Sequence, residues 1–165
     1  MNTELAKAQV KCLPFIGNTL AWQDKIAALV EGLGKEPQVE CPLKHYFLPG
    51  VYIREIFMPA GSVVIGKIHK TEHFNIIQRG AVSLFNADGT REILRGPLTF
   101  VSKPGVQKVL YIHEDTVWST VHLTEERDLE RLEAALIEPH SSYPQFDRTA
   151  EREAIAQAAS EGLLT

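Results

Sequence analysis

Short apolar runs alternate with turn-forming residues over the middle of this chain, from residue 51 to residue 123. Within the runs, β-branched and aromatic residues alternate with polar ones, which is the period-two pattern of a strand buried on one face. The runs occupy residues 51–58, 63–69, 74–78, 81–85, 90–94, 98–101, 106–113 and 117–123. About eight short strands at a spacing of 8–12 residues are typical of a β-sandwich or barrel. We therefore predict an all-β domain over residues 50–123.

The residues before this domain predict an N-terminal arm, residues 1–49, that contains an amphipathic helix. Apolar residues recur at helical spacing from Trp22 to Leu33, with Thr19 as a candidate N-cap and Gly32 or Gly34 at the end. Three prolines punctuate residues 35–49, which predicts an extended connection.

The residues after the domain, 124–165, predict C-terminal helices and a tail. Thr124 is the expected cap of a helix with an acidic first turn, a stripe formed by Leu129, Leu132 and Leu136, and a stop at Pro139. An alanine-rich stretch at residues 149–160 predicts a second helix. Since the arm and this tail both need a surface to cover their apolar faces, we expect a homodimer.

Composition and charge exclude several classes of function. The net charge is −4 and no basic stripe with interleaved aromatic residues is present, so we expect no nucleic-acid partner. No apolar run approaches the roughly 20 residues of a membrane helix, and the N-terminus lacks the apolar core of a signal peptide, which favours a cytoplasmic protein without membrane contact. Cys12 and Cys41 are too few for a zinc site or a disulfide scaffold and are expected to be reduced thiols.

Polar side chains gather within the strand pattern between residues 61 and 80. Period-two alternation places Lys67 and His69 on one face of a strand, and His73 and Asn75 on one face of the next. If these strands pair across the polar residues 70–72, all four side chains line the same interior. His113, at a strand end beside two acidic residues, is expected to face solvent.

The spacing of glycine, lysine and histidine in this stretch resembles the first motif of the cupin family. Gly61 is followed after five residues by Lys67, then by His69, by His73 three residues later, and by Gly80 after six more. The cupin pattern is glycine, five residues, His-x-His, three or four residues, glutamate, six residues, glycine.

A second stretch resembles the second cupin motif, in which a Pro-x-Gly turn precedes a histidine. Gly96, Pro104 and Lys108 occupy its positions, with the proline shifted by one residue. The resemblance covers residues 51–123 and implies a cupin-like jelly-roll β-barrel. The chain is also similar to small cupin-like proteins of phage and prophage genomes.

The side chains at these positions differ from the metal cage of three histidines and one glutamate that the resemblance implies. Lys67 replaces the first histidine, His73 replaces the glutamate, and Lys108 replaces the histidine of the second motif, whereas His69 is retained. An ammonium group has no lone pair to donate to a metal, but two lysines and two histidines suit a carboxylate or phosphate.

Three functional hypotheses follow. In the first, a small-molecule binding protein without a cofactor binds an anionic ligand in a cationic pocket formed by Lys67, His69, His73, Asn75 and Lys108. In the second, a metal-dependent cupin enzyme, such as a dioxygenase or isomerase, binds Fe, Mn, Ni or Zn through His69, His73 and His122. In the third, the barrel is the scaffold of a phage accessory or structural interaction protein. No nucleophile motif and no phosphate-binding glycine loop selects a reaction.

Overall fold

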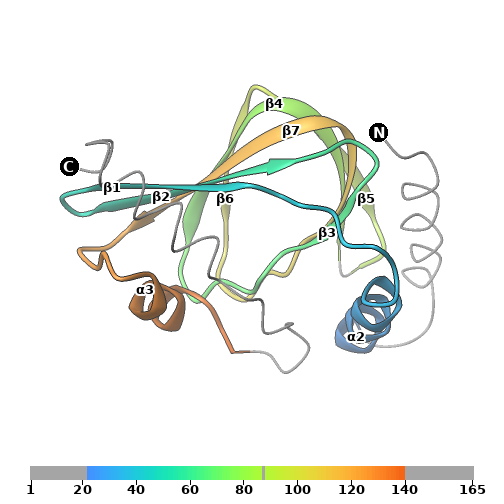
Figure 1. Cartoon of the computed structure of the whole chain (residues 1–165), viewed down its shortest axis with the longest axis horizontal. Coiled ribbons are helices and arrows are strands. Elements are labelled where there is room, and N and C mark those ends of the chain that lie inside the picture. Colours follow the sequence, from blue (N-terminus) through green and yellow to red (C-terminus); the bar gives the residue numbers. More distant parts are fainter. Residues whose placement is uncertain (1–21, 87, 140–165) are drawn as a thin grey trace.

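A computed structural model describes residues 22–86 and 88–139 of the chain. Seven strands pair antiparallel in the order β1-β2-β7-β4-β5, with β3 added on β7 and β6 on β4, and a helix lies at each end of this sheet (Figure 1). The elements are α2 (Trp22–Leu33), β1 (Leu43–Leu48), β2 (Val51–Met58), β3 (Val63–Ile65), β4 (His73–Phe85), β5 (Arg91–Arg95), β6 (Leu98–Ser102), β7 (Val109–Leu123) and α3 (Leu129–Leu136).

The two longest strands divide the sheet into two halves. The first half of β4 pairs with β6 and with the second half of β7, whereas the second half of β4 pairs with β5 and with the first half of β7. One half-sheet is therefore β1-β2-β7-β4-β6 and the other is β3-β7-β4-β5, and the same two strands pass through both. This arrangement confirms the predicted all-β jelly roll.

The pairing of β4 with β7 is irregular where the two halves meet. The register shifts between Ile77 and Val82, and Gly80 has a φ of 97°. A Cβ atom at Gly80 would lie 2.3 Å from the hydroxyl of Thr116 and 2.7 Å from backbone atoms, so this position accepts glycine alone. Bulges of this kind bend a strand without ending it. The prediction of separate strands at 74–78 and 81–85, and at 106–113 and 117–123, was therefore wrong.

The strands on either side of β2 in the sequence, β1 and β3, differ from the prediction. Residues 35–49 contain β1, which pairs with β2 over its whole length, so they are not merely a connection. The strand predicted at 63–69 ends at Ile65, and His69 instead forms an isolated bridge with Ile137. β3 pairs with β7, so the condition that β3 pairs with β4 across residues 70–72 is not met.

The helices cover opposite parts of the sheet (Figure 1). In α2, Ile26 and Leu29 are completely buried against Val63 and Val109, on the half-sheet that contains β3. In α3, Leu132 and Leu136 pack against Tyr52 at the other end. The predicted cap Thr19 and the helix predicted at 149–160 lie outside the described residues. Neither described helix has the length and apolarity needed to span a membrane.

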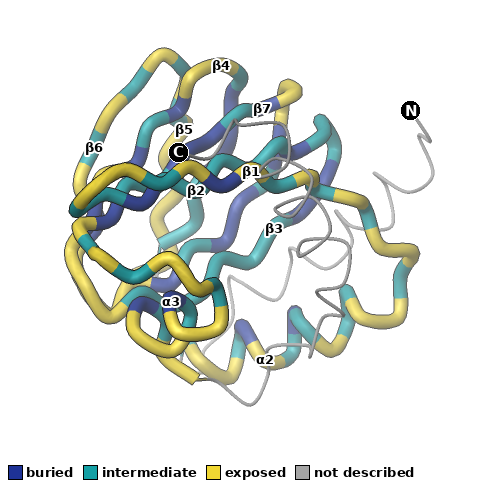
Figure 2. Tube along the Cα trace, turned by 60° about the vertical axis from the view of Figure 1, so that its left-hand side comes forward, coloured by how far each residue is buried: buried dark blue, intermediate teal, exposed yellow. Residues whose placement is uncertain are grey.

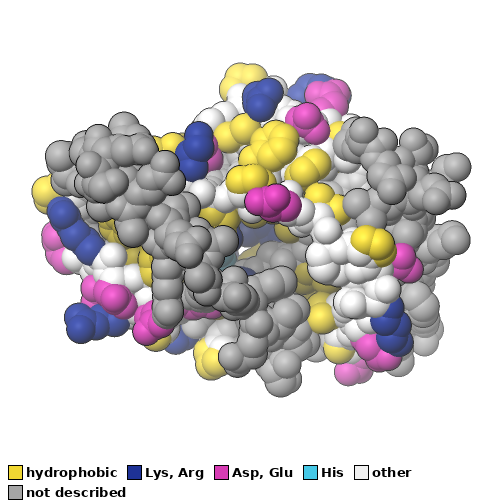
Figure 3. All heavy atoms as spheres, viewed as in Figure 1, with side chains coloured by type: hydrophobic (Ala, Val, Ile, Leu, Met, Phe, Trp, Pro, Cys, Tyr) yellow, Lys and Arg dark blue, Asp and Glu magenta, His cyan; other side chains and the backbone are white. Residues whose placement is uncertain are grey.

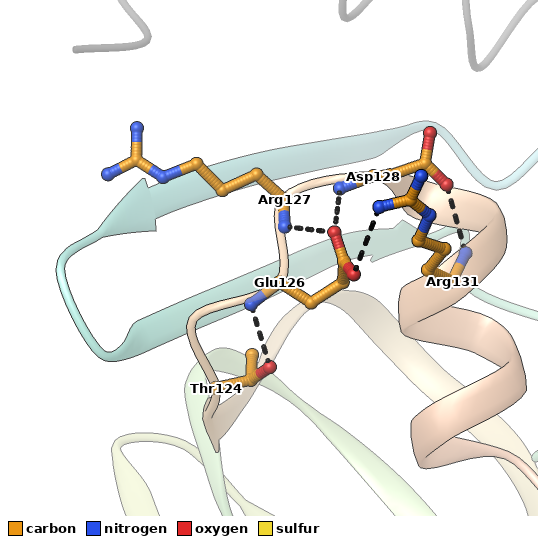
Figure 4. A network of polar contacts seen from close by, with 5 residues as sticks. All are labelled: Thr124, Glu126, Arg127, Asp128 and Arg131. Atoms are coloured by element: carbon orange, nitrogen blue, oxygen red, sulfur yellow. Dashed lines mark hydrogen bonds and ion pairs between the residues drawn. The ribbon is translucent and has the colours of Figure 1, made fainter.

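The N-cap of α3 is Asp128 and not the predicted Thr124. The carboxylate of Asp128 accepts a hydrogen bond from the backbone N–H of Arg131 at 3.0 Å (Figure 4). Thr124 accepts one from the backbone N–H of Glu126 at 3.1 Å, and the Glu126 carboxylate accepts two more, so residues 124–128 form a turn before the helix. Both residues satisfy local donors, but only Asp128 precedes the first helical turn.

The outer face of the larger half-sheet carries a row of apolar side chains beside a polar set formed by Glu55, Gln78 and Ser119. Buried residues follow β4 and β7, whereas exposed residues gather along β6 and at the turns (Figure 2). A row of outward side chains crosses five paired strands, namely Tyr46, Ile53, Val121, Phe74 and Val101. Phe74 is 53% exposed, and a surface groove of about 400 Å³ lies beside the row. Exposed apolar rows of this kind are a common feature of surfaces that contact other proteins.

The expectation of a homodimer rested on the arm and the tail, but α2 covers its apolar face on its own sheet. We propose instead that a homodimer forms through this row. Replacing Phe74 with aspartate places a charge in the contact and should shift the protein to monomer, as measured by size-exclusion chromatography with light scattering. Ile93→Asp is the matched control, because Ile93 is 62% exposed on β5 in the other half-sheet. A wild-type protein that is monomeric at high concentration would contradict the expectation.

Candidate functional site

The inner face of the larger half-sheet carries polar side chains in two neighbouring rows. In one row Tyr52 lies opposite His122, and His73 lies opposite Ser102. In the next row Arg54 lies opposite Thr120, which in turn lies opposite Asn75. Alternation along β2, β4 and β7 directs these side chains into the barrel. Beyond these rows the interior is apolar, with a core of Met58, Ile77, Val82, Leu110, Ile112 and Trp118.

Three histidines converge at the end of this inner face. His73 begins β4, His122 lies on β7, and His69 lies in the loop between β3 and β4. Their ring centroids are 4.1–5.0 Å apart, and one candidate ligand nitrogen from each lies within 4.8 Å of the others. His73 and His122 are only 4% and 3% exposed. The structure thus brings together the three residues of the metal hypothesis.

Backbone contacts orient the ring of His73 and position the chain at His69. Nδ1 of His73 lies 3.0 Å from the carbonyl oxygen of Thr71. Because a carbonyl can only accept, Nδ1 carries the proton and Nε2 carries the lone pair. His69 is held against the end of α3, where the N–H of Lys70 donates to the carbonyl of Leu136 at 2.8 Å and His69 bridges with Ile137.

Each histidine also presents a buried ring nitrogen without a hydrogen-bond partner. These atoms are Nδ1 of His69, Nε2 of His73 and Nδ1 of His122. An unsatisfied polar atom in the interior costs about 1–3 kcal/mol, so three in one cluster need an explanation. A metal ion or another ligand in the cluster would supply one.

Burial keeps the cluster neutral. Burial is the largest cause that lowers the pKa of His69 to about 2 and that of His122 to about 4, and the neighbouring histidines and the charge of Arg54 contribute to both shifts. Burial also lowers the pKa of His73, although the hydrogen bond to Thr71 opposes this. Neutral imidazoles have lone pairs available, which metal binding requires.

Two cations lie near the cluster. Burial lowers the pKa of Lys108 to about 8, and the positive charge of Lys108 disfavours protonation of His69 and His73. The positive charge of Arg54 acts to lower the pKa of His69, of His122 and of the partly buried thiol of Cys41, although burial raises the pKa of Cys41 overall. Figure 3 shows one face of the molecule hollowed near its centre, with basic and histidine side chains visible inside the hollow.

The sequence reasoning missed Arg54, although a signal was present. Arg54 shares its strand face with Tyr52 and Met58, which are 5% and 1% exposed. A charged residue on the apolar face of a strand is unusual and marks a candidate site.

The side chains of Lys67 and Asn75, which the binding hypothesis assigned to the ligand, are already bonded to other residues of the protein. The ammonium group of Lys67 forms an ion pair with Glu133 of α3 at 2.6 Å, which ties this helix to the barrel and offsets the lysine charge. Asn75 is 1% exposed, accepts a hydrogen bond from the Trp118 indole at 3.1 Å and donates one to Ser102 at 2.9 Å. Their contribution to ligand binding stays a prediction.

Fold and site together define the class of molecule: an antiparallel jelly roll with a histidine cluster inside one end. Among solved structures, a cupin domain from Bordetella pertussis is 14% identical, with 53% of this chain and 97% of that chain covered and a TM-score of 0.43. An RmlC-like cupin from Methanocaldococcus jannaschii with a double-stranded β-helix fold is 15% identical, with coverage of 55% and 86% and a TM-score of 0.44. The EutQ protein of Clostridium difficile is 10% identical, with coverage of 53% and 70% and a TM-score of 0.43.

These likenesses concern the fold alone. No family model and no curated protein matches the sequence. The likeness to phage proteins stays a prediction.

Proposed function

We propose that this chain binds one divalent transition-metal ion through His69, His73 and His122 and belongs to the metal-dependent class of cupin-like proteins. The observation that carries the proposal is the convergence of three neutral imidazoles, each with a buried ring nitrogen that has no partner. In a tetrahedral site with bonds of 2.0–2.1 Å, ligand nitrogens lie about 3.4 Å apart. The present separations, within 4.8 Å, reach this value after side-chain shifts of about one ångström.

Three protein ligands leave a coordination position open, as in catalytic zinc sites. Imidazole ligands suit Zn, Fe and Ni, which were among the metals predicted for this site. When bound, such an ion supplies Lewis-acid chemistry to the ligand in the open position. Lys108, which replaces a histidine of the cupin cage, does not fill that position while it is protonated.

The cationic pocket is a second candidate function, and Lys108 favours it. The side chain of Lys108 is largely buried but takes part in no ion pair or hydrogen bond recorded for residues 22–86 and 88–139. Such a charge is costly unless an anion compensates it. Since the ion pair with Glu133 offsets Lys67, Lys108 and Arg54 supply the positive charge. A small anion that binds in the cationic pocket and also coordinates the metal ion is consistent with both candidate functions.

Metal content tests the proposal directly. Protein stripped with a chelator and dialysed against Zn²⁺ or Ni²⁺ should retain about one ion per chain, as measured by elemental analysis. His73→Ala should retain less than about a tenth of this amount, because it removes a ligand. His113→Ala is the matched control, since His113 is exposed and contacts Ser83 away from the cluster, at 2.7 Å. Wild-type protein that stays far below stoichiometric loading would refute the metal site.

A further inference from the structure

The inner face of β2 carries a half-buried arginine, Arg54, that no described acidic residue neutralises. Arg54 lies in the middle of β2, and the groups whose protonation it influences, Cys41, His69 and His122, all lie inside the barrel. None of the ion pairs or hydrogen bonds found among residues 22–86 and 88–139 involves its side chain. Arg54 is half-buried on the inner face of the strand, and a cation without a counter-charge at this position favours a bound anion.

A second unsatisfied group lies directly beside Arg54. Thr120 is its partner in the register of β2 with β7, and the hydroxyl oxygen of Thr120 is buried without a hydrogen-bond partner. The next side chain in this row, Asn75, is already bonded to Trp118 and Ser102 and does not compete. A hydroxyl donor and a guanidinium therefore share one part of the inner wall.

This pair lies one row from the histidine cluster. Tyr52 and His122 are paired in the same two strands, two residues along from Arg54 and Thr120. A ligand bound to both rows thus extends from Arg54 to the open position of the proposed metal centre.

We propose that Arg54 and Thr120 bind the carboxylate of a small organic acid, which also occupies the open position of the histidine centre. This assignment rests on the proposed metal site. The planar guanidinium matches the two oxygens of a carboxylate, and the threonine hydroxyl donates a further hydrogen bond. A carboxylate oxygen is also an ordinary ligand for an ion held by imidazoles.

The surroundings favour a carboxylate over a phosphate. The wall on one side is apolar, with Trp118 and Ile56 in the row beyond Arg54. Desolvation of a phosphate dianion is more costly than that of a single carboxylate charge in such a site. Arg54 and Lys108 then supply positive charge around one carboxylate rather than around a larger polyanion.

Cobalt-loaded protein tests the assignment, since the visible spectrum of Co²⁺ reports its ligands. Titration with acetate should change this spectrum saturably. Arg54→Met should weaken acetate binding by about tenfold to a hundredfold, and Thr120→Val by about threefold to tenfold, with Co²⁺ stoichiometry unchanged. Arg95→Met is the matched control, because Arg95 is exposed and paired with Glu114 at 2.8 Å, and should bind acetate like the wild type.

The outcomes separate this inference from the metal site itself. Failure of the wild type to bind Co²⁺ refutes the metal site. Stoichiometric Co²⁺ with equal acetate affinity in wild type and Arg54→Met overturns the carboxylate subsite alone. Phosphate that binds more tightly than acetate, and that needs Arg54, overturns the choice of ligand. Should Arg54→Met fail to fold, Arg54→Lys is used in its place. Lysine keeps the positive charge but lacks the paired N–H donors of the guanidinium group. Unchanged acetate affinity in Arg54→Lys would overturn the proposal.

Discussion

Zn²⁺ at a thousandfold excess over its dissociation constant is expected to raise the free energy of unfolding of the metal-free protein by about 4 kcal/mol. The unfolded chain does not hold His69, His73 and His122 together, so the ion stabilises the folded state. For a domain of this size the midpoint of thermal unfolding should rise by roughly 8–16 °C. Differential scanning calorimetry with a chelator and then with Zn²⁺ measures the shift.

Substitution of one ligand decides whether that shift comes from the histidine cluster. His122→Ala should lose most of it, because two imidazoles bind the ion far more weakly than three. His113→Ala should retain it, since His113 lies outside the cluster. An equal shift in wild type and His122→Ala would assign zinc to a different site.

The metal-free protein is expected to lose about 4 kcal/mol of stability between pH 7 and pH 5. Folding lowers the pKa of His69 to about 2 and that of His122 to about 4, whereas both rise to about 6.5 in the unfolded chain. Below pH 6.5 the unfolded state therefore binds protons that the folded state excludes, and stability falls with pH by about 2 kcal/mol per histidine. The positive charges of Lys108 and Arg54 are part of the cause, because they disfavour protonation of His69 in the folded state.

Thermal unfolding in the presence of a chelator measures this pH dependence. The unfolding midpoint should fall by roughly 10 °C between pH 7 and pH 5. Carboxylates contribute little in this range, since their ordinary pKa values lie near 4. The double variant His69→Gln, His122→Gln is the control and should show a much flatter profile. A wild-type midpoint that is the same at both pH values would contradict the neutral, buried state of the cluster.

The strand pattern was predictable because alternation is a local property. The run at residues 51–58 agrees with β2 residue for residue, since its alternating side chains need one buried face. The two motif glycines were also informative: Gly61 and Gly80 both adopt positive φ angles, and Gly80 lies against backbone that excludes any side chain.

The limits of the strands were less predictable. Residues 113–116 look like the end of a strand, yet β7 continues through them because β4 provides a bulged partner. Likewise, Thr124 and Asp128 are equally suitable caps when judged by residue type, and packing of Leu132 and Leu136 on Tyr52 places the helix start at Asp128. Strand continuity and helix start depend on neighbours that are distant in the chain.

The spacing of His69 and His73 indicated the candidate site from the sequence, and one of the sequence-based hypotheses already included His122 as a third ligand. The sequence by itself determined the strand alternation, the glycine positions and the types of residue at the motif, because each depends on neighbours close along the chain. Only the tertiary structure decided that Glu133 pairs with Lys67 and that Arg54 lies beside an unsatisfied Thr120. Ion pairing and desolvation depend on residues that meet through strand register and helix packing, which sequence spacing does not encode.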